Sequence, residues 1–137
     1  MTINDQSGLR RILQAARVIA VVGHSNNPQR TSYRIAAYLR AAGYRVHAVN
    51  PTIRTVDGEP VYASLAEVPE QIDIVDVFRR SEFLSEVVDQ AIAVGAKAVW
   101  AQLGVVDENA ARKAELAGLD VVMDRCIMVD HRMLLVK

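Results

Sequence analysis

Residues 18–34 read V-I-A-V-V-G-H-S-N-N-P-Q-R-T-S-Y-R, an apolar run that opens into a polar loop and then into an amphipathic segment. The run is apolar throughout, as in a strand of a parallel sheet that is covered on both faces. A buried strand, a donor-rich loop and a helix start are typical of α/β proteins that hold a phosphate group, because the N–H groups and the dipole of a helix N-terminus favour an anion. The stretch therefore predicts a phosphate-binding loop.

The rest of the chain repeats this alternation of apolar runs with segments that carry apolar residues at helical spacing. Strands separated by helices of about 10 to 14 residues are typical of right-handed βαβ units. We therefore expect one Rossmann-like α/β domain over residues 1–137, with a doubly wound, five-stranded, mainly parallel sheet and helices on both faces. The expected strands are 17–23, 44–50, 72–78, 97–102 and 119–123, and the expected helices are 9–16, 31–42, 81–94 and 107–117.

Two segments do not follow the alternation. Residues 52–69 are irregular, with a D-G turn signal at 57–58 and a short extended piece at 61–62. Residues 126–135 fit either a final helix or an edge strand, because their apolar positions match both periods.

Charge and cysteine content limit the classes of function. Lys plus Arg and Asp plus Glu number 16 each, so no net charge draws the chain to nucleic acid or to an anionic membrane. A single cysteine excludes an intrachain disulfide and a multi-cysteine zinc or iron–sulfur site. The N-terminus does not read as a signal peptide, and no apolar stretch reaches the roughly 20 residues of a membrane span. We therefore expect a cytoplasmic protein.

The loop after the first strand supplies the first candidate site. Ligands of doubly wound sheets bind beyond the carboxyl ends of the strands, near the point where the strand order reverses. Backbone N–H groups from His24 onward, the hydroxyls of Ser25 and Ser32, and the Arg30 guanidinium can all meet phosphate oxygens there. The alternative is a solvated loop whose hydroxyls only cap the helix. Thr31 or Ser32 is the expected cap under both interpretations.

The ends of the other strands supply further candidates. Asn50 and Pro51 either border a ligand or simply terminate a strand, and Arg54 is either a second phosphate contact or a solvated charge. Phe78 either stacks on a base or belongs to the core. The remaining candidates at this rim are Gln102, Leu103 and Gly104.

Several catalytic and cofactor patterns are absent. A dinucleotide dehydrogenase needs G-x-G-x-x-G and an acidic residue at the end of the second strand, but this strand ends V-N-P, and the P-loop pattern is missing too. His24 and Cys126 can both lie at the rim, but a nucleophilic pair is not the simplest reading of either, and the three histidines lack metal-ligand spacing. Asp73 and Asp76 lie three positions apart on a strand and so face opposite sides. We therefore expect no catalytic residues and no metal.

The chain resembles a small stand-alone CoA-binding protein, of the family related to the N-terminal domain of the succinyl-CoA synthetase alpha subunit and of NDP-forming acyl-CoA synthetases. The resemblance rests on V-V-G-H-S-N-N-P-Q-R-T-S, V-N-P, V-D-V-F-R, V-W-A-Q-L-G and M-D-R-C-I-M-V-D-H, spread in order from Val21 to His131. It implies that the domain binds coenzyme A or an acyl-CoA without catalysing a reaction by itself, and that a protein partner supplies any chemistry. An NAD(P)- or nucleotide-dependent enzyme that uses the same rim is the alternative.

The resemblance also assigns parts of the ligand to residues. The thiol end of the pantetheine arm would approach Cys126, where a mixed disulfide with CoA can form under oxidation. Family members often carry a basic residue directly after the N-P pair, where this chain has Thr52, so Arg54 would have to replace it at the 3′-phosphate. The implied contacts are Gly23, His24, Ser25 and Arg30 at the diphosphate, Asn50 and Pro51 at the adenosine, Val77, Phe78 and Arg79 at the adenine or ribose, and Gln102, Leu103 and Gly104 along the arm.

Overall fold

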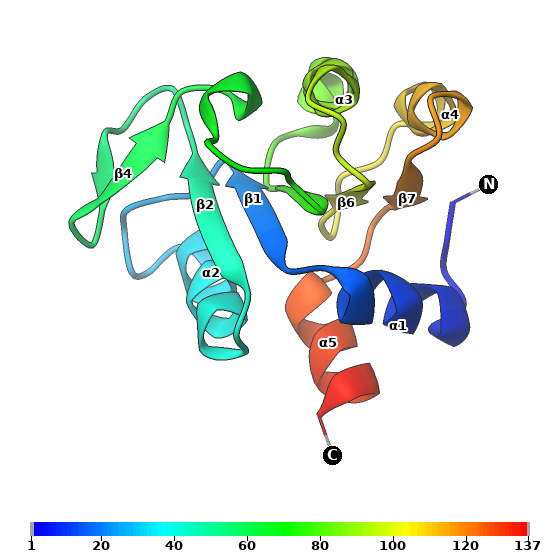
Figure 1. Ribbon diagram of the computed structural model, residues 1–137, viewed down its shortest axis with the longest axis horizontal. Coiled ribbons are helices and arrows are strands. Elements are labelled where there is room, and N and C mark those ends of the chain that lie inside the picture. The colour runs from blue at the N-terminus through cyan, green and yellow to red at the C-terminus, as the bar shows by residue number, and fades with distance from the viewer. Residues whose placement is uncertain (1, 137) are drawn as a thin grey trace.

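Apolar side chains fill the central strands from end to end. In the computed structural model, which describes residues 2–136, every residue of β1 (Val18–Val22), β5 (Ile74–Val77) and β6 (Ala98–Ala101) is buried. Such strands need a cover on both faces. One face is covered by α1 (Gln6–Ala15), α2 (Thr31–Ala41) and α5 (Ile127–Leu135), and the other by α3 (Leu84–Ala93) and α4 (Glu108–Leu116), as Figure 1 shows.

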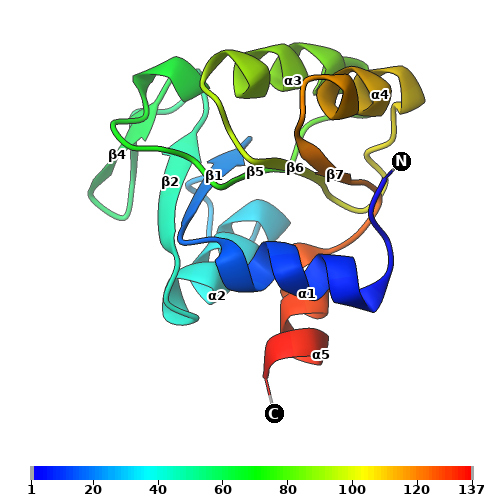
Figure 2. The same ribbon diagram turned by 45° about the vertical axis from the view of Figure 1, so that its right-hand side comes forward.

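The sheet has seven strands, whereas the sequence analysis predicted five. Its order is β3-β4-β2-β1-β5-β6-β7, completed by β2 (Arg45–Val49), β3 (Thr55–Val56), β4 (Glu59–Tyr62) and β7 (Asp120–Val122) (Figure 2). All neighbours are parallel except β3 and β4, which form an antiparallel hairpin. Asp57 and Gly58 take positive φ values of 50° and 82° in the hairpin turn, as a tight turn between such strands requires. These two strands are too short to show a period in the sequence.

The side chains of each strand divide between two apolar cores. Val75 and Val77 pack with α3 and α4, whereas Ile74 packs with Val21 and Trp100 against α1, α2 and α5. This alternation follows from the pleat, which points successive side chains to opposite faces. The segment that the sequence left open between helix and strand is the helix α5, which closes the second core. A three-layer α/β/α Rossmann-like fold results.

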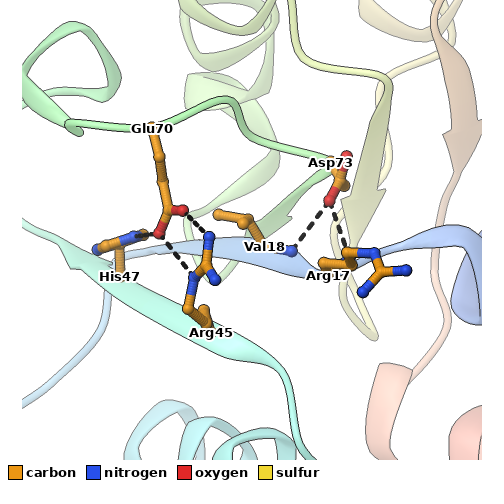
Figure 3. Close-up of polar contacts among 6 residues, drawn as sticks. All are labelled: Arg17, Val18, Arg45, His47, Glu70 and Asp73. Carbon is orange, nitrogen blue, oxygen red and sulfur yellow. Dashed lines mark hydrogen bonds and ion pairs between the residues drawn. The ribbon is translucent and has the colours of Figure 1, made fainter.

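Polar side chains hold the amino ends of the strands together. Asp73, just before β5, accepts hydrogen bonds from the backbone N–H groups of Arg17 and Val18 at 2.8 and 3.0 Å. Glu70 accepts from the Arg45 guanidinium and from His47, both on β2 (Figure 3). The edge opposite the predicted site is therefore fixed by two carboxylates.

Two features of residues 2–136 bear on function. None of the helices in this range is both long and apolar enough to pass through a membrane. The His, Cys, Asp and Glu side chains of the same range form no cluster of three that could hold a metal ion.

Candidate functional site

The strand order reverses between β1 and β5, because the chain runs from β1 to β2 on one side and continues through β5, β6 and β7 on the other. A cavity of about 570 Å³ opens at the carboxyl ends of the strands around this point, which is the ligand position of doubly wound sheets. Its wall is built from the loop after β1 and the start of α2, the segment after β5, and the segment after β6. The lining residues are Gly23, Ser25, Arg30, Thr31, Ser32, Phe78, Arg79, Arg80, Gln102, Leu103, Gly104 and Val105.

Gly23 lets the chain leave β1 directly against the next strand. Its φ is +88°, and a Cβ built on it would lie 2.4 Å from the carbonyl oxygen of Phe78. Any side chain would therefore push the loop after β1 away from the segment after β5. The cavity needs glycine at this position.

The start of α2 presents uncapped N–H groups to the cavity. Arg30 occupies the N-cap position, and its side chain makes no capping hydrogen bond. The prediction that Thr31 or Ser32 caps the helix was therefore wrong. Ser32 instead uses its Oγ to accept a hydrogen bond from the N–H of Ser25 at 3.0 Å. The positive end of the helix dipole is thus left for an anion, with Arg30 beside it.

His24 lies beneath the loop and does not line the cavity. Its side chain is fully buried, with Nδ1 2.7 Å from the carbonyl oxygen of Ser25 and Nε2 3.2 Å from Arg40 Nη1. Arg40 is always a donor, so Nε2 accepts and Nδ1 donates. Burial lowers the pKa of His24, and the nearby Arg40 charge lowers it further. A neutral imidazole therefore holds the loop from below, whereas the phosphate contact predicted from the sequence is the backbone N–H of His24.

The residues after β2 also lie outside the cavity. Asn50 Nδ2 donates to the carbonyl oxygen of His24 at 3.1 Å, so this side chain supports the loop rather than lining the site. Pro51 and Arg54 are exposed. The structure places none of these three side chains in the cavity wall.

The segment after β5 brings two further guanidinium groups to the cavity. Arg79 stacks on the ring of Phe83, with 4.4 Å between its Cζ and the ring centroid. Its Nη1 lies 3.9 Å from Glu86 Oε1. Arg80, which the sequence analysis did not single out, also lines the wall. The adjacent R-R pair at the end of a predicted strand was the available signal for it. Thr31 and Val105 were missed as well, each next to a residue that was named.

The segment after β6 is pinned from both sides. Gly104 N donates to Asp124 Oδ1 at 2.7 Å, and Ser81 Oγ donates to the carbonyl oxygen of Gly104 at 3.2 Å. Gln102 is nearly buried, whereas Leu103 is 68% exposed beside it. This wall of the cavity therefore offers the side-chain amide of Gln102 next to the apolar surface of Leu103.

Val77 and Cys126 lie elsewhere. Val77 is fully buried and packs with α3 and α4. Cys126 stands at the N-cap position of α5, half-buried against the other core. Neither side chain lines the cavity.

A family model and two relatives of similar length match this chain. A family model described as a CoA binding domain matches residues 17–132. YneT, an uncharacterized protein of Bacillus subtilis, is 43% identical over 93% of this chain and 94% of YneT. The solved structure of a hypothetical protein from Pyrococcus horikoshii OT3 has a TM-score of 0.93 at 38% identity, covering 98% of this chain and 96% of that one.

A larger protein matches as well. The ADP-forming acetate–CoA ligase I of Archaeoglobus fulgidus is 25% identical to this chain. The match covers 81% of this chain but 18% of the ligase, so the chain spans less than a fifth of that relative's length.

Proposed function

The chain belongs to the family of CoA-binding domains, and on that premise we propose that it binds coenzyme A or an acyl-CoA in the cavity between β1, β5 and β6. The observation that carries the proposal is the uncapped start of α2, with Arg30 beside it, at the point where the strand order reverses. A diphosphate is the part of the ligand that such a surface suits best.

The diphosphate would be held by the loop after β1 and the first turn of α2. Arg30 can reach phosphate oxygens with paired N–H groups, and Ser25 can donate its hydroxyl because its Oγ already accepts from Asn27 N. The absent Cβ of Gly23 lets its backbone lie against the Phe78 carbonyl, which keeps the loop after β1 beside the segment after β5 as two walls of the cavity. His24 and Asn50 would act from beneath, by keeping the loop in place.

The other two walls would hold the rest of the molecule. Phe78, Arg79 and Arg80 offer an aromatic surface and two positive charges for the adenosine side. Gln102, Leu103 and Gly104 would follow the pantetheine arm. Contacts of Pro51 with the adenosine, of Arg54 with the 3′-phosphate and of Cys126 with the thiol remain predictions from the family resemblance.

We propose further that the domain itself catalyses no reaction. The ADP-forming acetate–CoA ligase I of Archaeoglobus fulgidus, whose name states a reaction, matches over 18% of its own length. Chemistry on the acyl group would then come from a protein partner, and co-purification with an ATP-grasp protein would identify it. A cytoplasmic location suits the free thiol of Cys126.

Isothermal titration calorimetry tests the binding proposal. Coenzyme A, 3′-dephospho-CoA, NAD and ATP would be titrated into the same protein. We expect coenzyme A to bind and Arg30→Ala to weaken it by about tenfold or more, the worth of a charge-assisted hydrogen bond. Arg30 makes no capping bond, so its removal should leave α2 intact.

Arg34→Ala is the matched control, because Arg34 is exposed on the same helix but does not line the cavity. It should bind coenzyme A like the unmodified protein. Weaker binding of 3′-dephospho-CoA, with the difference lost in Arg54→Ala, would place Arg54 at the 3′-phosphate. Binding of NAD or ATP without coenzyme A would overturn the proposal and favour a nucleotide-dependent enzyme.

A further inference from the structure

A carboxyl group lies buried in the middle of the sheet, directly below the cavity wall. Asp76 is the third residue of β5 and has no exposed surface. Its neighbours in register are Val21 of β1 and Trp100 of β6, both apolar. Burying a carboxyl group in such surroundings is costly unless the group is hydrogen-bonded. Asp76 therefore places a carboxyl group, whose burial costs free energy, where valine or isoleucine could stand.

The carboxyl group has one hydrogen-bond partner among the described residues, and that partner belongs to the cavity. Gln102 Nε2 donates to Asp76 Oδ1 at 2.5 Å, in a bond that is buried, and Asp76 Oδ2 has no partner. Gln102 is 5% exposed and lines the cavity. The backbone of Gln102 is fixed too, since its N–H donates to Val77 O and its carbonyl accepts from Val105 N.

The bond to Asp76 decides which end of the amide a ligand meets. Nε2 is engaged below the wall, whereas Oε1 is neither paired nor enclosed among residues 2–136. In its ionised form Asp76 can only accept, so above its pKa it cannot hold the amide by its oxygen. With Asp76 ionised, the cavity wall thus presents an acceptor at this point.

We infer that Asp76 is a positioning residue that turns Gln102 Oε1 toward the cavity, so that the site selects a ligand with an N–H donor there. This inference rests on the proposed function, and the donor it fits is a secondary amide of the pantetheine arm. An acceptor that the bound ligand covers discriminates strongly, because an analogue without the donor leaves it covered and unpaired.

The first experiment measures this selectivity. The ligands are coenzyme A and analogues in which each amide N–H of the arm is replaced in turn by an ester oxygen. Burial raises the pKa of Asp76 to about 8, so titrations at pH 9 examine the carboxylate form. We expect one ester analogue to bind about tenfold more weakly than coenzyme A, because that analogue would cover the acceptor and leave it unpaired.

Two variants test the role of Gln102 and the role of Asp76 separately. Gln102→Met removes the acceptor and should bind coenzyme A and the ester analogues within about twofold of each other. Asp76→Val keeps Gln102 but frees its amide to rotate, and should reduce the discrimination to under about threefold. Equal discrimination in the unmodified protein and Gln102→Met would overturn the inference, and so would discrimination that persists in a folded Asp76→Val.

A second experiment needs no ligand and does not depend on Asp76→Val being stable. In a ¹H–¹⁵N spectrum, the side-chain NH₂ signal of Gln102, assigned by its absence in Gln102→Met, should shift with pH as Asp76 titrates, with a midpoint well above 4. Gln71 is the internal control, since its Nε2 donates to the carbonyl oxygen of Gly95 and should not shift. An unshifted Gln102 signal would overturn the inference.

The two experiments fail independently. If coenzyme A does not bind the unmodified protein, the proposed function fails, while the NH₂ titration still decides whether Asp76 holds Gln102. If coenzyme A binds but the ester analogues bind equally well, the proposed function stands and the inference fails.

Discussion

Gly23 meets a steric and a conformational requirement at the same time. Its φ of +88° disfavours any residue with a Cβ, and the carbonyl oxygen of Phe78 occupies the place where a Cβ would go. We expect Gly23→Ala to destabilise the protein by about 3 kcal/mol or more, of which the left-handed backbone accounts for about 1–2. Urea unfolding measures the loss.

Gly118 separates the two contributions. Its φ is +91°, yet a Cβ there would meet nothing within 4 Å. Gly118→Ala should therefore cost about 1–2 kcal/mol, the backbone contribution alone. If both alanine variants lost the same free energy of unfolding, the contact with Phe78 would not be what requires glycine.

Single residues were predictable where their type alone defines the chemistry. Arg30 could be expected at the rim because it lies in the loop that follows an apolar run, and Gln102 because it stands at the end of one. The position of His24 could not, because its ring bonds Arg40, which lies 16 residues further along the chain. Sequence spacing does not reveal which side of a loop a side chain takes.

At the scale of elements, Glu70 ties β2 to the segment that leads into β5. It accepts hydrogen bonds from Arg45 and from His47 (Figure 3), and these hold its pKa at about 2, well below the usual 4.5. A lowered carboxyl pKa gives stability that is complete above about pH 4.5 and is lost as the pH falls toward 2.

We therefore expect Glu70→Gln to lower stability by about 1 kcal/mol at pH 7, the scale of a partly exposed ion pair. The difference from the unmodified protein should shrink as the pH falls from 4.5 to 2. Thermal unfolding at several pH values measures it. Glu67→Gln is the control, since Glu67 is exposed nearby. A Glu70→Gln difference that did not change with pH would contradict the assigned pKa.

Helices and strands could be predicted where the hydrophobic period extends over many residues. The first four helices and the five predicted strands all appear close to their expected positions, because burial imposes a period over many residues. The β3–β4 hairpin was not foreseen as a pair of strands, since it is only 2 and 4 residues long. The helix α2 was expected, but its cap was not identified, because a serine that could cap it bonds the loop instead.

At the scale of the whole molecule, stability should fall from the middle of the sheet toward the β3 edge. β1 and β5 are buried at every position, whereas three of the four residues that pair between β3 and β4 are exposed. Backbone amides exchange through opening events whose free energy rises with burial. We expect peptides from β1, β5 and β6 to exchange hydrogen slowest and residues 55–62 to exchange fastest among the strands.

Hydrogen–deuterium exchange with mass spectrometry tests this order without any variant. Addition of coenzyme A should slow exchange in residues 23–32, 78–80 and 102–105, and leave residues 55–62 unchanged. Protection of the hairpin in place of the cavity wall would show that the ligand binds elsewhere.

Trp100 gives the molecule an optical property of its own. It is the single tryptophan of the chain, it is fully buried on β6, and its Nε1 donates to the carbonyl oxygen of Arg125. An indole shielded in this way emits at shorter wavelength than one in water and is out of reach of soluble quenchers. Unlabelled protein therefore carries a fluorescent reporter on the strand next to Asp76, and its emission reports a disturbance of the sheet around that residue.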